Sequence, residues 1–186
     1  RLCIDALIAE INKKEEYINL SVLSDIKRTK IPVNKSIVFV YSKEQSEIAA
    51  EYSDKAFIGI PAELAAECND RLSGNGGVLP NIARNKDKSY LNKIISMCID
   101  RNVAGIVVRN YEEIEYILNS KFKGFVISGS EIYAPNKKAV ELLDNIFDGI
   151  VLPLELSKRE LKSIYRDNSF IFAYGKIPMM QTANCV

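Results

Sequence analysis

Residues 104–130 read AGIVVRNYEEIEYILNSKFKGFVISGS and contain one complete unit of the pattern that decides the fold. A short β-branched run at residues 106–109 is followed by apolar residues at helical spacing (Ile114, Ile117 and Leu118) and then by a second short run at residues 125–127. Strands that read as continuous apolar runs are typical of parallel sheets covered by helices. The segment therefore predicts a strand, a helix and a second, parallel strand.

The same rhythm extends in both directions from this segment. Short apolar runs predict seven strands, at residues 37–41, 56–60, 77–82, 106–109, 125–127, 150–152 and 170–174. Stretches with helical spacing lie between them, around residues 48–52, 91–98, 114–118, 140–146 and 156–164. Successive strands begin roughly 20 to 27 residues apart, the length of one strand-helix unit with short loops. The fold class is therefore α/β with a parallel sheet.

The chain length limits how this sheet closes. An eight-stranded barrel of about 22 residues per unit that begins at residue 37 would end near residue ~213, whereas the chain has 186 residues. Either the sheet is open and doubly wound, or the chain is a (β/α) barrel-like domain with about seven strands, a truncated TIM-type barrel. The second is more economical, because residues 1–18 have helical spacing with no capping residue before them.

Two regions are therefore expected. Residues 1–35 are interpreted as the C-terminal helix of an upstream module plus a linker, and residues 36–186 as the barrel-like domain, incomplete at its C-terminus. We expect the domain to pack against neighbouring modules of a longer chain.

Composition excludes several classes of protein and chemistry. Hydrophobic residues make up 47% and charged residues 26% of the chain, which excludes a disordered chain. The net charge is +1, so the overall charge does not attract nucleic acid or anionic lipid. No apolar run is long enough for a membrane span, and four cysteines without CxxC spacing favour a cytoplasmic location. With no histidine, these residues alone cannot supply Ser-His-Asp or Cys-His catalysis.

Candidate site residues follow from the fold class, because ligands of parallel α/β domains bind beyond the carboxyl ends of the strands. The polar residues at those positions are Ser42, Glu63, Asn81, Arg84, Arg109, Asn110, Ser128, Glu131, Asn136, Glu155, Tyr174, Lys176 and Cys185. Each alone is more often a helix cap or loop residue than a catalyst, and it is their convergence on one rim that favours a site. Glu131 and Glu155 are the right types for an acid/base pair, although the sequence does not fix their separation.

Glycine and cysteine positions allow further interpretations. The cluster at residues 74–77 precedes a strand rather than opening a helix, so it is interpreted as a loop and not as a phosphate cradle. Cys68 and Cys98 lie among apolar residues at helical spacing, which predicts buried thiols. Cys185 lies in a polar stretch on the expected ligand side and is a candidate nucleophile or metal ligand.

Several motifs resemble those of the collagenase-like peptidases, the PrtC-type family of unassigned catalytic type. Residues 174–185, YGKIPMMQTANC, look like that family's YGR-hydrophobic-PLM-x-(S/T)-x-x-C segment. The other matches, in family order, are residues 79–84 (LPNIAR) with LP-x-I-x-R, residues 106–110 (IVVRN) with GVLVRN, Asn136 with the asparagine of DYSLNVFN, and residues 152–156 (LPLEL) with LSPEL.

The resemblance implies a barrel-like peptidase (hydrolase) domain acting on protein or peptide substrates by an unassigned mechanism. With the strand-end positions, it leads us to expect catalytic roles for Glu155, Arg84, Arg109 and Lys176, a metal-ligand role for Cys185, and substrate-binding roles for Asn136 and Tyr174. Glu131, which no family motif contains, is expected to bind substrate from its position after a strand. Cofactors stay open, with a [4Fe-4S] cluster or a divalent metal considered for the full-length protein.

Two other functions remain as alternatives. Other family members resemble iron-sulfur-dependent hydroxylation factors for tRNA, rRNA or a quinone precursor, in which Cys185 would be one cluster ligand and RNA a partner. The second alternative is that the chain is a non-catalytic copy of such a domain and binds a partner. Two departures from the family favour that reading slightly, because Gly129 and Tyr133 stand where Asp and Asn are common. Lys176 also replaces the usual Arg, which keeps the charge but loses bidentate binding of a carboxylate or phosphate.

Overall fold

The computed structural model describes residues 36–52, 56–61, 64, 75–82 and 88–177. The expected upstream helix and linker, and the candidates Glu63, Arg84 and Cys185, lie outside these residues. The boundary between residues 35 and 36 therefore stays a prediction.

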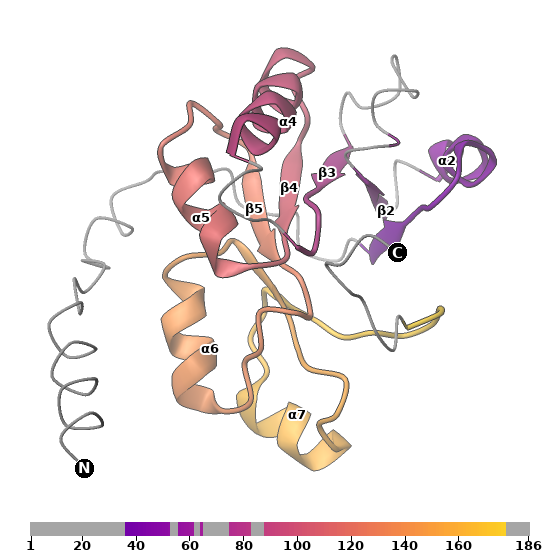
Figure 1. Cartoon of the computed structure of the whole chain (residues 1–186). Coiled ribbons are helices and arrows are strands. Elements are labelled where there is room, and N and C mark those ends of the chain that lie inside the picture. Colours follow the sequence, from indigo (N-terminus) through magenta and orange to yellow (C-terminus); the bar gives the residue numbers. More distant parts are fainter. Residues whose placement is uncertain (1–35, 53–55, 62–63, 65–74, 83–87, 178–186) are drawn as a thin grey trace, which may run out of the picture.

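Seven parallel strands form one sheet in which spatial order follows chain order. They are β1 (Ser36–Phe39), β2 (Ala56–Pro61), β3 (Gly76–Val78), β4 (Gly105–Val108), β5 (Phe125–Ser128), β6 (Gly149–Val151) and β7 (Ser169–Phe170). A doubly wound sheet reverses its strand order at a switch point, whereas a barrel does not. The sheet curls into a half-barrel with β1 and β7 at its edges, so the prediction of a truncated barrel-like α/β fold is confirmed (Figure 1).

Helices follow the strands on the outer side of the sheet (Figure 1). They are α2 (Lys43–Ala50), α4 (Lys88–Asp100), α5 (Tyr111–Leu118), α6 (Lys137–Asp144) and α7 (Lys158–Ile164). Four of them begin at a Ser or Asn whose side chain accepts a backbone N–H of the first turn: Ser42, Asn110, Asn136 and Ser157. The connections are shortest after β1 and β4, where α2 and α5 begin within a few residues of the strand end.

Side-chain alternation gives the sheet two apolar faces. Ile106 and Val108 of β4 face the helices and join the main core, while Val107 faces the concave side. The concave face is filled at its amino-terminal end by Phe57 and Phe125, whose rings meet edge to face with centroids 4.9 Å apart. The carboxyl end of the concave face is left open.

Glycines make room for this aromatic pair. A Cβ on Gly76 would lie 1.6 Å from Cζ of Phe57, and one on Gly105 would lie 2.1 Å from Cε2 of Phe125. Gly76 is the first residue of β3, so the loop interpretation of residues 74–77 is wrong at this position. The physical reason for a glycine at position 76 is the close packing of the Phe57 ring on the concave face, rather than the geometry of a turn.

Candidate functional site

A cavity of about 320 Å³ opens at the carboxyl ends of the strands. Residues from β1 through the segment after β7 line it, so the whole curled sheet contributes. Its walls are mainly apolar, with few polar side chains. The residues that line it are Phe39, Tyr41, Pro61, Val78, Leu79, Pro80, Asn81, Ile82, Val107, Arg109, Gly129, Ser130, Glu131, Val151, Leu154, Phe172, Lys176 and Ile177. An apolar pocket with a few convergent polar groups is the usual form of a ligand site.

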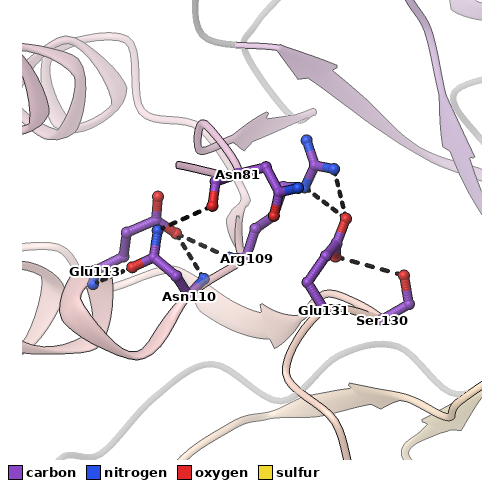
Figure 2. A network of polar contacts seen from close by, with 6 residues as sticks. All are labelled: Asn81, Arg109, Asn110, Glu113, Ser130 and Glu131. Carbon is purple, nitrogen blue, oxygen red and sulfur yellow. Dashed lines mark hydrogen bonds and ion pairs between the residues drawn. The ribbon is translucent and has the colours of Figure 1, made fainter. Parts of the chain in front are cut away.

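An ion pair between Arg109 and Glu131 is the main polar feature of the cavity. Arg109 follows β4 directly, and because Val108 faces the helices, the next side chain points to the concave side. Its Nε donates to Oε1 of Glu131 at 2.9 Å, and its Nη2 donates to the same oxygen (Figure 2). The two side chains are 20% and 27% exposed, so the pair is partly shielded from solvent but open to a ligand.

Gly129 leaves the space that the Glu131 carboxylate occupies. A Cβ at this position would lie 2.5 Å from Oε2 of Glu131 and 3.3 Å from Cγ of Arg109. The glycine that departs from the family pattern therefore permits the ion pair, and a larger residue there requires another arrangement of Glu131.

Glu113 lies behind this ion pair and was not among the residues selected from the sequence. It is buried, and its Oε2 accepts the backbone N–H of Arg109 at 2.8 Å and that of Asn110 at 3.3 Å (Figure 2). Asn110 in turn accepts the backbone N–H of Glu113 at 3.0 Å, which completes a capping box. The signal available in the sequence was the spacing Asn110-x-x-Glu113.

Burial raises the pKa of Glu113 to about 7, against the lowering effect of the hydrogen bonds from the backbone of Arg109 and Asn110 and of the Arg109 charge. Its other oxygen, Oε1, is buried without a hydrogen-bond partner. A carboxyl group in this setting exchanges its proton near neutral pH.

The remaining candidates lie at different places. Lys176 lines the cavity with Arg109 and Glu131, while Asn136 caps α6. Glu155 is exposed and outside the cavity lining, and Tyr174 is 97% exposed. The structure therefore brings together four of the predicted site residues, because Asn81 also lines the cavity, and the functional roles of all of them stay predictions.

The described residues do not fit a metal or iron-sulfur centre. They contain no group of three or more His, Cys, Asp or Glu side chains that could hold a metal ion. Cys98, predicted to be buried, is a core residue with 1% exposure, and burial raises the pKa of its thiol to about 11. Cys185, on which the iron-sulfur alternative depends, lies outside the described residues, so that alternative stays a prediction.

Comparison with solved structures gives the fold a relative. The structure of the U32 peptidase Mk0906 is similar over 74% of this chain and 67% of that chain, with a TM-score of 0.53 and 14% sequence identity. The chain has a U32-peptidase-like fold. The expected resemblance to collagenase-like peptidases is thereby confirmed at the level of the fold.

Sequence comparisons add nothing to this structural match. No protein-family model matches the chain, and no curated protein matches it. Within the part of the chain that the structure describes, no helix has the length and apolar character needed to cross a membrane.

Proposed function

We propose that the chain is a collagenase-like peptidase domain that takes an extended peptide, with one large apolar side chain, into the strand-end cavity. The observation that supports this is the mainly apolar cavity that contains the Arg109–Glu131 ion pair, in a fold similar to that of a U32 peptidase.

The ion pair has the donor and acceptor that a peptide backbone needs. Arg109 uses Nε and Nη2 on Glu131, and its Nη1 is left to donate to a peptide carbonyl. Oε2 of Glu131 receives only a long contact of 3.4 Å from the Ser130 hydroxyl, so it can accept a peptide N–H. A peptide unit placed against the pair would satisfy both groups.

The size of the cavity favours an unfolded substrate. Ligand pockets range from about 300 to 1,000 Å³, and at about 320 Å³ this one is among the smallest. It has room for one large side chain and its backbone, but not for a folded segment. We therefore expect cleavage of denatured collagen or loose peptides in preference to the intact triple helix.

Peptide release from gelatin by the intact chain tests this proposal. Glu131→Gln and Arg109→Gln should each reduce release about tenfold or more, because a hydrogen bond to a charged group contributes about 1.5 to 3 kcal/mol. Arg159→Gln, at an exposed position of α7 that does not line the cavity, is the matched control and should leave release unchanged. Glu155→Gln tests the exposed glutamate separately.

The proposal fails if no peptide is released while divalent metals and reductants are varied. It also fails if Glu131→Gln and Arg109→Gln behave as the unmodified chain does, because the cavity would then not be the site.

A further inference from the structure

Two helices of this chain, α5 and α7, begin with a capping box, but the glutamates of the two boxes have different surroundings. On α7, Glu160 accepts the backbone N–H of Ser157 at 2.8 Å and is exposed. On α5, Glu113 is fully buried, and its bond reaches one residue further back, to the N–H of Arg109. Helix capping alone does not require burial, so Glu113 is in a position to do more than start a helix.

We infer that Glu113 is a positioning residue for the cavity: its buried carboxylate holds the backbone of Arg109, and gain of a proton there loosens Arg109 against Glu131. The inference rests on the proposed function only in taking Arg109 as a ligand-binding residue.

Arg109 provides the mechanical link between the two faces of the sheet. Its amide donates to Glu113 on the helical side, while its guanidinium donates to Glu131 on the concave side (Figure 2). A hydrogen bond to a carboxylate is about twice as strong as one to a neutral acceptor. Protonation of Glu113 therefore weakens the bond that fixes the first residue after β4.

The proton has a place to bind without breaking other bonds. Oε1 of Glu113 is buried and has no partner, so a proton there displaces no hydrogen bond. Arg109 is the charged group that acts on this carboxyl, and no charged group of α4 or β5 among the described residues affects its pKa, which burial raises to about 7. The transition thus falls near neutral pH, because burial raises the pKa more than the hydrogen bonds from Arg109 and Asn110 and the Arg109 charge lower it.

The chain itself contains a neutral version of the same bond. At the start of α2, Oε1 of Gln45 accepts the backbone N–H of Tyr41 at 2.8 Å, the same distance as between Glu113 and Arg109. Tyr41 is the second residue after β1, and Arg109 is the first residue after β4. A Glu113→Gln variant should therefore fold and keep the bond, but without a titrating group.

A nuclear magnetic resonance titration of the intact, isotope-labelled chain tests the inference. Between about pH 5 and pH 9, the amide signals of Arg109 and Asn110 should shift with a midpoint near 7. The carbon-detected Nε and Cζ signals of Arg109 should follow with the same midpoint. Both transitions should be absent in Glu113→Gln and unchanged in Glu160→Gln, the matched exposed capping box.

If the amides titrate while the Arg109 guanidinium signals stay constant, Glu113 is a helix cap only and the inference is overturned. It is equally overturned if neither set of signals moves near pH 7. Since the unmodified chain alone gives these outcomes, they hold even if a variant fails to fold. Because no activity is measured, either result leaves the peptidase proposal to its own test.

Discussion

Replacing Glu113 by Gln should change how the stability of the domain depends on pH. Burial raises the pKa of Glu113 to about 7 in the folded chain, against 4.5 for an exposed glutamate. Between these values the folded chain binds more protons than the unfolded chain, so the free energy of unfolding falls as pH rises and levels off above pH 7. At about 1.4 kcal/mol per pH unit, the interval corresponds to roughly 3 kcal/mol.

Urea unfolding of the unmodified chain and of Glu113→Gln, each from about pH 5 to pH 8, measures this effect. As pH rises over that range, the free energy of unfolding of the unmodified chain should fall by about 3 kcal/mol relative to that of the Gln variant. With urea slopes of about 1 to 3 kcal/mol/M, the relative midpoint moves by about 1 M or more.

Glu160→Gln is the control, because this glutamate makes the same type of capping box in solvent. Hydrogen bonds from Ser157 lower the pKa of Glu160, so its contribution has the opposite sign: it is present above the usual pKa and is lost as pH falls. The reasoning about Glu113 is refuted if its Gln variant and the unmodified chain give parallel profiles between about pH 5 and pH 8.

Three further substitutions test the packing of the site and its support. Gly129→Ala should displace Glu131, so the nuclear magnetic resonance signals of the Arg109 guanidinium should lose the shift that the ion pair causes. The free energy of unfolding, measured by thermal denaturation, should fall by less than about 1 kcal/mol, because the ion pair is partly exposed. Gly76→Ala should destabilise the domain by about 1 to 3 kcal/mol in urea, because its Cβ meets the Phe57 ring, and Phe57→Leu in the same chain should recover part of the loss. Ser128→Ala should be neutral or stabilise by up to about 1 kcal/mol in the same assay, because it removes a buried hydroxyl without a partner.

Matched changes make these results decisive. Ser120→Ala removes a hydroxyl that donates to Ile117 and accepts from Phe122, so it should destabilise by about 1 kcal/mol where Ser128→Ala does not. Equal effects of the two serine substitutions would contradict the account of Ser128. No recovery with Phe57→Leu would show that the cost at Gly76 arises elsewhere.

The sequence predicted all seven strands because the five inner strands are largely buried, and because the more exposed edge strands β1 and β7 still belong to short apolar runs. It placed the ends of three strands too late, at residues 41, 82 and 174, because the apolar residues continue into the cavity lining after the strand has ended. The choice between an open sheet and a half-barrel depended on strand order, which local patterns do not contain.

The candidate site was predicted as a set of positions but not as a set of contacts. Arg109, Glu131 and Lys176 follow from the rule that ligands bind at strand ends, and the structure places all three at one cavity. The ion pair between Arg109 and Glu131 depends on Gly129, because a side chain at that position would occupy the space of the Glu131 carboxylate. The sequence does not show that these residues are in contact. Glu113 was missed because it stands between Glu112 and Glu115, both exposed, and reads as part of a solvated helix face.

The position of Arg109 explains why a residue on the far side of the sheet matters for the cavity. Successive residues of a strand face opposite sides, so Arg109, the first residue after β4, has its side chain among the cavity residues and its backbone beside the start of α5. In a parallel α/β fold this crossing occurs wherever a strand gives way to a helix, but here the acceptor on the helical side is a buried acid. The helix start that most half-barrel units use only for capping therefore becomes, at α5, a site where one proton is coupled to the charged group of the cavity.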